Sequence, residues 1–410
     1  MTASFVIDFK TRTSRGLNAF RRGAGAIFLG LALAACTTGS LNPIGTGTSQ
    51  TATPAAPSGD LIGAGGVKVA LLLPASAGGN IGSIAGPLRN AAQLAVQDFQ
   101  TANIQLIVKD TQGTPAGATA AAEAAVTEGA ELIVGPLLGS SVSAVAPVAR
   151  AANVPVIAFS TDTTVAGPGV YLLSFLPQND IRRIVSYASS QGRTTMAALL
   201  PDNGYGVVVG NAVSEAAAAR GVNVTSVERY PANAAGMATP AQGTAATVRA
   251  GATAVVLPDG AGALGTLGPL LQRNGVDPLQ TKILGSGQWD NPTSQRIPFL
   301  AGGWYAAPNP AGWTNFRSRY SSTFGGQPPR IATIPYDAVS LAAALSRGRP
   351  GQRYTTSVLT NPSGFAGVDG IFRFTRDGLN QRGLAVLEVT PGGGARVIDP
   401  APTRFAGAGF

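Results

Sequence analysis

Hydrophobic and polar positions alternate along most of this chain in blocks rather than residue by residue. Short apolar runs that end in glycine or proline are each followed by an alanine-rich stretch with helical spacing. Strands that are apolar on both faces are typical of parallel sheets covered by helices on both sides. The pattern predicts strands at 67–73, 104–109, 132–134 and 156–159, and helices at 88–99, 116–127 and 141–151.

The same pattern of blocks starts again near residue 180. Strands are predicted at 195–200, 222–230 and 254–257, with helices at 180–190, 206–220 and 242–250. Two landmarks recur in the same order, since VALLLP (69–74) resembles MAALLP (196–201) and GAELIVGP (129–136) resembles GATAVVLP (251–258). We therefore predict an α/β protein of two doubly wound parallel-sheet lobes with a cleft between them.

The last part of the chain is predicted to cross back between the lobes. Helices are expected to start at 316–320 and to cover 336–346, and a hairpin is expected from 371–375 and 384–389, because Asp377-Gly378 is a strong turn signal. The predicted division is a leader at 1–35, a flexible tether at 36–66, an N-terminal lobe at 67–176 plus 302–350, a C-terminal lobe at 177–301 plus 351–390, and a tail at 391–410.

The first 36 residues have the pattern of a secretory leader. Five basic residues precede or begin an apolar run that is shorter than the about 20 residues needed to span a bilayer. The run ends in Leu33-Ala34-Ala35-Cys36, which resembles the lipobox of bacterial lipoproteins. Because Cys36 is the only cysteine, we predict that it is lipidated; an ordinary cysteine near a leader is the alternative. The tether would then hold the body on the periplasmic side of the envelope, at the outer membrane.

Composition excludes several classes of function. The chain has no histidine and a single cysteine, so a Ser-His-Asp triad, a Cys-His pair and histidine-rich zinc sites are impossible. It also lacks a Ser-x-x-Lys acylation motif and a Walker loop. Loss of residues 1–35 would lower the net charge from +9 to +5, and the remaining arginines are scattered, which argues against nucleic acid. We predict a protein that is not an enzyme, with no catalytic residues, metal or cofactor.

Several motifs together resemble the type I periplasmic binding protein superfamily, in its leucine-binding protein branch. They occur in the family's order at LPASAG (73–78), IVGP (133–136), PDNGYG (201–206), YDAV (336–339) and FAGVDGIFRF (365–374). The resemblance implies a ligand bound between two lobes, at the loops that follow the parallel strands. Such loops are also where open parallel sheets bind ligands in general.

These loops supply the candidate ligand-binding residues, which are Ser76, Ser140, Ser141, Ser160, Thr161, Tyr205 and Trp289. Helix capping is the alternative role for the hydroxyl residues of the second and third loops. The alternative for Trp289 is a place in the core. Tyr205 stands where the resemblance implies an aromatic residue against the ligand.

Three positions depart from the amino-acid binders of this family. Those proteins hold the ligand carboxylate with Ser or Thr in two loops and its ammonium with an acidic residue. Here the ungapped register puts Gly139 and Asp162 at the first two positions and Gly287 at the third. A shift by one residue would restore Ser140 and Thr161, but we do not expect a free α-amino acid as ligand.

A sub-branch of lipoproteins, the penicillin-binding protein activators, is similar to this chain at GGWYAAP (302–308), FRSRY (316–320) and QRGL (381–384). That resemblance implies a regulator of peptidoglycan synthases, with a synthase as protein partner. The alternative is the substrate-binding component of an ABC importer for amino acids, amides or related solutes, with an ABC permease as partner. Both hypotheses allow a small-molecule ligand in the cleft, and they differ in whether the cleft or the outer surface acts.

Overall fold

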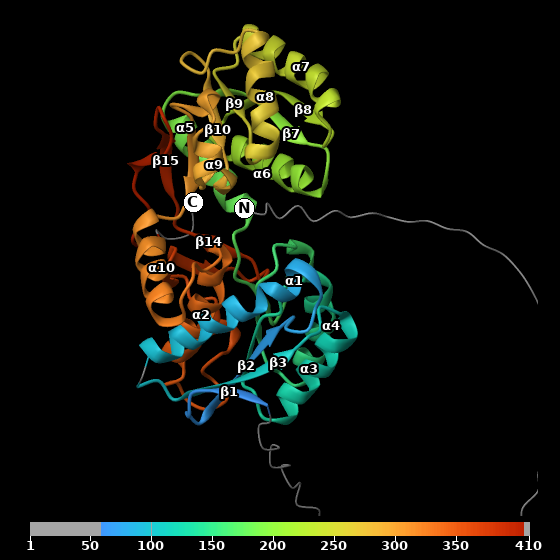
Figure 1. Cartoon of the computed structure of the whole chain (residues 1–410), viewed down its shortest axis with the longest axis vertical. Helices are drawn as coiled ribbons and strands as arrows, with labels where there is room; N and C mark the ends of the chain where they lie inside the picture. Colours follow the sequence, from blue (N-terminus) through green and yellow to red (C-terminus); the bar gives the residue numbers. More distant parts are fainter. Residues whose placement is uncertain (1–58, 100, 406–410) are drawn as a thin grey trace, which may run out of the picture. The chain divides into compact units, whose positions relative to one another are not determined.

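The computed structural model describes residues 59–99 and 101–405, and it confirms the α/β architecture with parallel-sheet lobes (Figure 1). The predicted leader, Cys36 and most of the tether lie outside the described residues. Within them, no helix combines the length and the apolar character that crossing a bilayer requires.

The first lobe is built on a six-stranded sheet. Its strands lie in the order β1 (Asp60–Ile62), β3 (Ile104–Asp110), β2 (Val67–Leu73), β4 (Leu132–Val134), β5 (Val156–Ala158) and β6 (Val170–Leu172). Its helices are α1 (Gly79–Ser83), α2 (Ala85–Asp98), α3 (Pro115–Thr127), α4 (Gly139–Ala151), α10 (Pro310–Phe324), α11 (Thr333–Leu345) and α12 (Thr356–Leu359), with short 3-10 turns η1 (Thr163–Val165) and η5 (Arg330–Ala332). A small antiparallel sheet of β12 (Phe365–Gly367), β13 (Gly370–Phe374) and β14 (Asn380–Arg382) completes this lobe.

The second lobe is built on a seven-stranded sheet. Its strands lie in the order β16 (Ala395–Asp399), β15 (Ala385–Val389), β11 (Trp304–Ala307), β10 (Lys282–Gly285), β9 (Ala254–Val256), β7 (Thr195–Pro201) and β8 (Asn223–Tyr230). Its helices are α5 (Pro177–Ser190), α6 (Gly204–Arg220), α7 (Ala238–Arg249), α8 (Ala261–Arg273) and α9 (Pro292–Gln295), with η2 (Ala234–Met237), η3 (Gly287–Trp289) and η4 (Pro298–Leu300).

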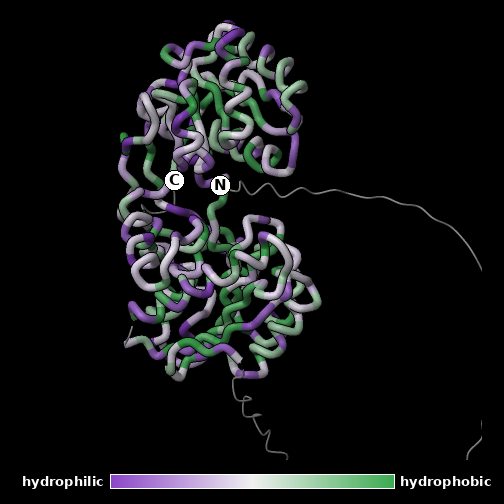
Figure 2. The backbone as a smooth tube through the Cα atoms, viewed as in Figure 1, coloured by the Kyte–Doolittle hydropathy of each residue, from purple (hydrophilic) through white to green (hydrophobic). Residues whose placement is uncertain are grey.

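The central strands are largely apolar because their two faces are buried in two different cores. In β2, Leu71 belongs to a core with α2 and α11, whereas its neighbours Ala70 and Leu72 belong to a core with α3 and α4. Successive side chains of a strand point to opposite faces, so a strand covered on both sides needs apolar residues at every position. Hydrophobic segments accordingly follow the strands in both lobes (Figure 2).

The boundaries of the two lobes differ from the prediction. Residues 304–307 form β11, which pairs with β10 and β15 in the second sheet rather than joining the N-terminal lobe. Residues 351–383 belong to the first lobe, because Tyr354, Leu359 and Phe372 are buried in its core. The local pattern predicted the elements, but it carried no signal for which sheet each late element would join.

The predicted hairpin is wrong in one of its strands. Its turn at Asp377-Gly378 is present, but β13 pairs with β14, and residues 385–389 form β15 in the other sheet. The tether and the tail also contain strands that were not predicted. Residues 60–62 form β1 along the edge of β3, and residues 395–399 form β16 along β15. Both additions cover sheet edges whose backbone groups would otherwise lack strand partners.

Candidate functional site

The candidate site consists of the loops that follow the parallel strands of the two lobes. In the first lobe, the amide of Ser76 donates a hydrogen bond to Asp110 Oδ1 at 3.2 Å, and the amide of Gln112 donates to the same oxygen at 2.8 Å. Burial raises the pKa of Asp110, but these hydrogen bonds outweigh it and the net shift is downward. The exposed Ser76 therefore lies beside a carboxylate at the end of β3.

The next loop brings a carboxylate to the start of α4. The helix begins at Gly139, and its N-cap residue Leu138 makes no side-chain capping bond. A Cβ atom built on Gly139 would lie 2.9 Å from Oδ2 of Asp162. A carboxylate next to the free N–H groups of a helix N-terminus is electrostatically favourable. Asp162 thus fills the space that a side chain at position 139 would occupy.

The candidate hydroxyl residues in the loops after β4 and β5 have different environments. Ser160 is buried, and its Oγ accepts a hydrogen bond from the amide of Asp162 at 3.1 Å. Ser141 is also buried, and its hydroxyl has no partner among the described atoms. Ser140 and Thr161 are exposed. The two loops come together through Asp162, and the structure gives Ser160 a local role in holding its own loop.

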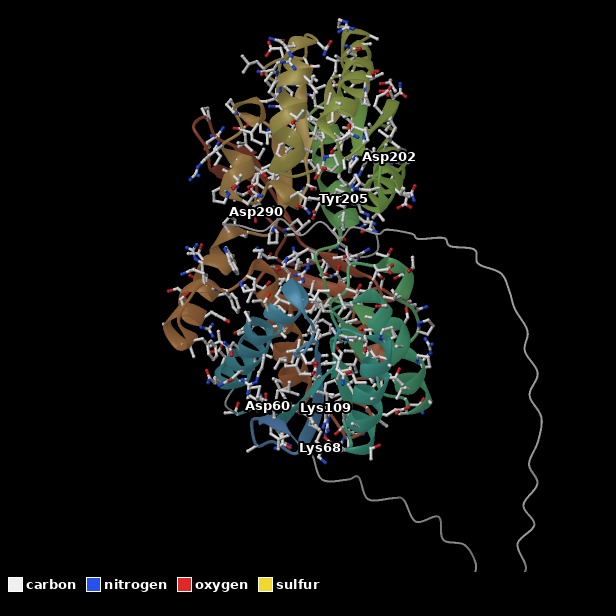
Figure 3. The ribbon with its side chains drawn as sticks, turned by 45° about the vertical axis from the view of Figure 1, so that its right-hand side comes forward. Asp60, Lys68, Lys109, Asp202, Tyr205 and Asp290 are labelled. Carbon is white, nitrogen blue, oxygen red and sulfur yellow. The ribbon has the colours of Figure 1, made fainter. Side chains whose placement is uncertain are left out.

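In the second lobe, Tyr205 joins the loops that follow three strands. Its hydroxyl donates to the carbonyl of Pro258 at 3.0 Å and lies 3.0 Å from Oγ of Ser286. Burial raises the pKa of Tyr205, so its hydroxyl stays protonated at neutral pH. Tyr205 and Asp290 are at the same end of this lobe (Figure 3).

A second carboxylate stands beside the glycine that follows β10. Asp180, in the first turn of α5, accepts a hydrogen bond from the amide of Gly287 at 3.0 Å. A Cβ atom built on Gly287 would lie 3.0 Å from the same oxygen. Burial raises the pKa of Asp180 to about 7, against the opposing effect of this hydrogen bond. At both glycine positions singled out in the sequence, a carboxylate from another loop or helix takes the place of the missing side chain.

Trp289 lies in the core of the second lobe. Its side chain is 0% exposed, packs near Tyr305 and donates from Nε1 to the carbonyl of Leu257 at 3.1 Å. The structure therefore favours the structural alternative for this residue over a contact with ligand. A large aromatic side chain suits both a protein core and a ligand cleft, so the sequence did not distinguish these two positions for Trp289.

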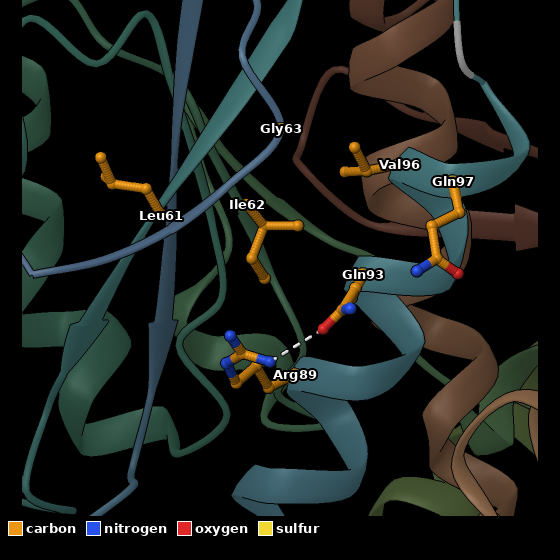
Figure 4. A pocket seen from close by; sticks show the side chains of 7 residues that line it. All are labelled: Leu61, Ile62, Gly63, Arg89, Gln93, Val96 and Gln97. Carbon is orange, nitrogen blue, oxygen red and sulfur yellow. Dashed lines mark hydrogen bonds between the residues drawn. The ribbon is translucent and has the colours of Figure 1, made fainter.

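A separate pocket lies at the edge of the first lobe. It has a volume of about 360 Å³ and is lined by residues of β1, the loop after it and α2 (Figure 4). Arg89 bonds to Gln93 one turn further along α2 at 2.9 Å, and it also forms an ion pair with Asp60 of β1. Since none of its lining residues comes from the loops after the parallel strands, this pocket is not part of the candidate site.

Three polar residues of the site were missed from the sequence. Asp110 ends β3 and Ser286 directly follows β10. A polar residue at the end of a parallel strand was a usable signal for the site. Asp180 offered none, because its carboxylate meets Gly287, which is 107 residues away in the chain. Only the packing of α5 against the sheet brings these two residues together.

Comparison with known proteins places this arrangement in a family. The sequence pattern of the family described as periplasmic binding protein matches residues 66–395, and the chain belongs to this family. Its two lobes have the type I fold of these proteins. The comparison with curated proteins finds no match.

Solved structures with the same fold are ABC transporter proteins. One, from Rhodospirillum rubrum and assigned as a branched-chain amino acid ABC transporter, has a TM-score of 0.70 at 19% identity, covering 81% of this chain and 99% of its own. A substrate-binding protein from Desulfitobacterium hafniense in complex with Leu has a TM-score of 0.57 at 17% identity, covering 81% and 99%. A solute binding protein from Rhodopseudomonas palustris BisB5 in complex with 3,4-dihydroxy benzoic acid has a TM-score of 0.56 at 21% identity, covering 83% and 97%.

These comparisons show the family and the fold of this chain, and the structures named here include no regulator of a peptidoglycan synthase. The family consists of binding proteins, and its name indicates a periplasmic location. The resemblance to penicillin-binding protein activators has no support among them.

Proposed function

We propose that this protein is the solute-binding component of an ABC importer. The observation that carries the proposal is the family match over residues 66–395, combined with polar side chains at the strand ends of both lobes. We further propose that its solute carries an ammonium or another hydrogen-bond donor and no free carboxylate. The candidate ligand residues are Ser76, Ser140, Thr161 and Tyr205, with Asp162 and Asp180 setting the charge.

The charge of the site supports this choice of solute. Asp162 lies at the start of α4, where the N–H groups of Gly139 and the following residues would otherwise attract an anion. Two like charges about 4 Å apart near a protein surface repel by about 4 kcal/mol. That repulsion would weaken binding of a carboxylate about a thousandfold, since each ~1.4 kcal/mol is a factor of ten. A cation at the same place would be attracted.

The test is calorimetry on the purified full chain with three solutes that share one side chain. These are L-leucine, L-leucine amide and 3-methylbutylamine, which carry a carboxylate, an amide and no carbonyl group, respectively. We expect the amide or the amine to bind more tightly than leucine. Asp162→Asn should narrow the difference in affinity between leucine and the other two solutes. It should do so by improving leucine binding, because it removes the negative charge and keeps the shape of the side chain. Glu215→Gln, at an exposed carboxylate in the C-terminal half of α6, is the control.

Two results would contradict the proposal. Leucine binding more tightly than its amide would refute the choice of solute while leaving the importer hypothesis intact. If no solute in a broader screen of amines, amides and amino acids bound, and the chain instead bound a peptidoglycan synthase, the synthase-regulator hypothesis would replace it.

A further inference from the structure

Charged side chains gather where the chain passes between the lobes. The three connecting segments are residues 173–176, 308–309 and 383–384. The first segment is tied to β14, the strand that leads into the third, because Asn380 Nδ2 and Arg382 Nε both donate to the carbonyl of Ser174, at 2.8 and 3.2 Å. Asn179 of α5 donates to Asn380 in turn, at 3.0 Å. The connecting region is therefore polar and densely hydrogen bonded.

The first lobe contributes two guanidinium groups, Arg330 and Arg382, which we call the guanidinium pair. Both lie on Phe175 of the first connecting segment, with Arg330 at 4.7 Å and Arg382 at 5.1 Å from the ring centre. Arg330 is held by two hydrogen bonds to Asp369, at 2.6 and 3.1 Å. Arg382 is only 8% exposed, and both of its Nη atoms lack a partner among the described atoms.

The second lobe contributes two carboxyl groups, Asp180 and Asp290, which we call the acidic pair. Asp290 accepts a hydrogen bond from Tyr305 at 3.3 Å, and Asp180 accepts the one from Gly287. Among the described residues, neither makes an ion pair within 4 Å. The positive charge of a first-lobe guanidinium nevertheless lowers the pKa of each carboxyl group. Arg382 has this effect on Asp180, and Arg330 has it on Asp290.

We propose that the acidic pair and the guanidinium pair are positioning groups that draw the two lobes together, and that protonation of the acidic pair releases them. A buried guanidinium whose two Nη groups lack hydrogen-bond partners is costly, and so is a buried carboxylate. Movement of the lobes toward each other would offset both costs by forming direct ion pairs. Closure around a solute is the motion that the proposed function requires, and this region is where it must be controlled.

The surroundings of these groups determine the direction of the pH effect. Asp180 faces the Gly287 amide, Asp290 and Arg382, and Asp290 faces Tyr305, Arg330 and Asp369. The guanidinium pair also faces Asp337 of α11 and Asp369, which belong to its own lobe.

Burial raises the pKa of Asp180 to about 7 and raises that of Asp290 as well. Asp180 is therefore neutral in mild acid and becomes charged as the pH rises through about 7, and Asp290 becomes charged at a higher pH than an exposed carboxyl group does. Once charged, both attract the guanidinium groups of the other lobe. Burial also raises the pKa of Asp337 to about 7, so this first-lobe carboxyl becomes charged over the same pH range and competes with the acidic pair for the guanidinium groups. The Asp180 and Asp290 variants below isolate the contribution of the acidic pair.

The test uses small-angle X-ray scattering of the full chain without any solute. Between about pH 5.5 and about pH 8.5, we expect the radius of gyration to fall as the pH rises, with a midpoint near the pKa of Asp180, about 7. Asp180→Asn and Asp290→Asn should each reduce this change, and the double variant should abolish it. Asp290→Glu, which keeps the charge, should retain the change in radius of gyration. Arg330→Met, which removes one guanidinium group, should reduce it.

Asp202→Asn is the matched control, since this exposed carboxyl lies in the same lobe outside the acidic pair. Circular dichroism of every variant identifies any loss of folding, and the isosteric Asp→Asn changes preserve the hydrogen bonds accepted from Gly287 and Tyr305. A radius of gyration that does not change with pH would overturn the proposal. A change that persists in the double variant would overturn it equally. Because no solute is present, neither result depends on the proposed importer function.

Discussion

Replacement of Asp180 by Asn should change how the stability of the protein depends on pH. The folded-state pKa of Asp180 is about 7, whereas its ordinary value is 3.8, and burial is the main cause. The folded protein therefore holds this proton more tightly than the unfolded chain does. By linkage, the free energy of unfolding of the wild type should fall as the pH rises from about 4 to about 7. Above about pH 7 the contribution of Asp180 should be constant.

The size of the effect follows from the shift. Each unit of pKa difference corresponds to about 1.4 kcal/mol, so a shift of this size amounts to about 4 kcal/mol as an upper bound. Asp180 is half-buried, and water at the carboxylate reduces the figure to about 2–4 kcal/mol. Asn is neutral at every pH and its side-chain oxygen can still accept the hydrogen bond from Gly287. The variant should match the wild type near pH 4 and exceed it by that amount near pH 8.

Chemical denaturation at about pH 4.5 and about pH 8, at equal ionic strength, measures the difference. Asp202→Asn is the control, because it removes an exposed carboxyl from the same lobe. If Asp180→Asn showed the same pH dependence as the wild type, the carboxyl would not be buried at a cost. If it were less stable than the wild type at about pH 8, the charged carboxylate of Asp180 would be stabilising, and the cost of its burial would not be the dominant effect.

Three other changes test separate features. Trp289→Ala should destabilise the second lobe by about 3–5 kcal/mol, measured by denaturation, because it removes a fully buried side chain; an effect confined to ligand affinity would contradict the core assignment. Gly378→Ala should cost more than ~1 kcal/mol in the same assay, since φ is 85° and a Cβ would lie 2.2 Å from the carbonyl of Val170; Gly392→Ala, at a similar φ with open space, is its control. Cys36→Ser should release the protein from membranes in cell fractionation, because lipid anchoring needs the thiol; a protein that stays in the membrane fraction would refute lipidation.

The order of strands and helices could be predicted from the sequence alone. In β2 and β7, every position after the second is apolar because helices cover both faces of each sheet, and that pattern is visible without a structure. The repeat of the pattern indicated two lobes, and the family motifs indicated the kind of protein. These signals are local, so they survive without knowledge of the tertiary fold.

The assignment of late elements to lobes depended on tertiary packing. Residues 371–375 and 384–389 read as one hairpin, yet β13 lies in the first lobe and β15 lies in the second. The chain leaves one lobe between Arg382 and Ala385, and the glycine there, Gly383, does not distinguish a crossing between lobes from an ordinary turn. A strand pairs with whichever edge the whole fold offers, so the pairing of an apolar segment cannot be read from its own residues.

The chemistry of the candidate site was likewise decided in three dimensions. Gly139 and Gly287 looked like positions that had lost their binding groups. The structure instead places Asp162 and Asp180 in the space of their absent side chains. The sequence alone determined that these glycines carry no functional group. Only the folded chain brings a carboxylate to each of them, because side chains that meet through packing have no fixed spacing along the sequence.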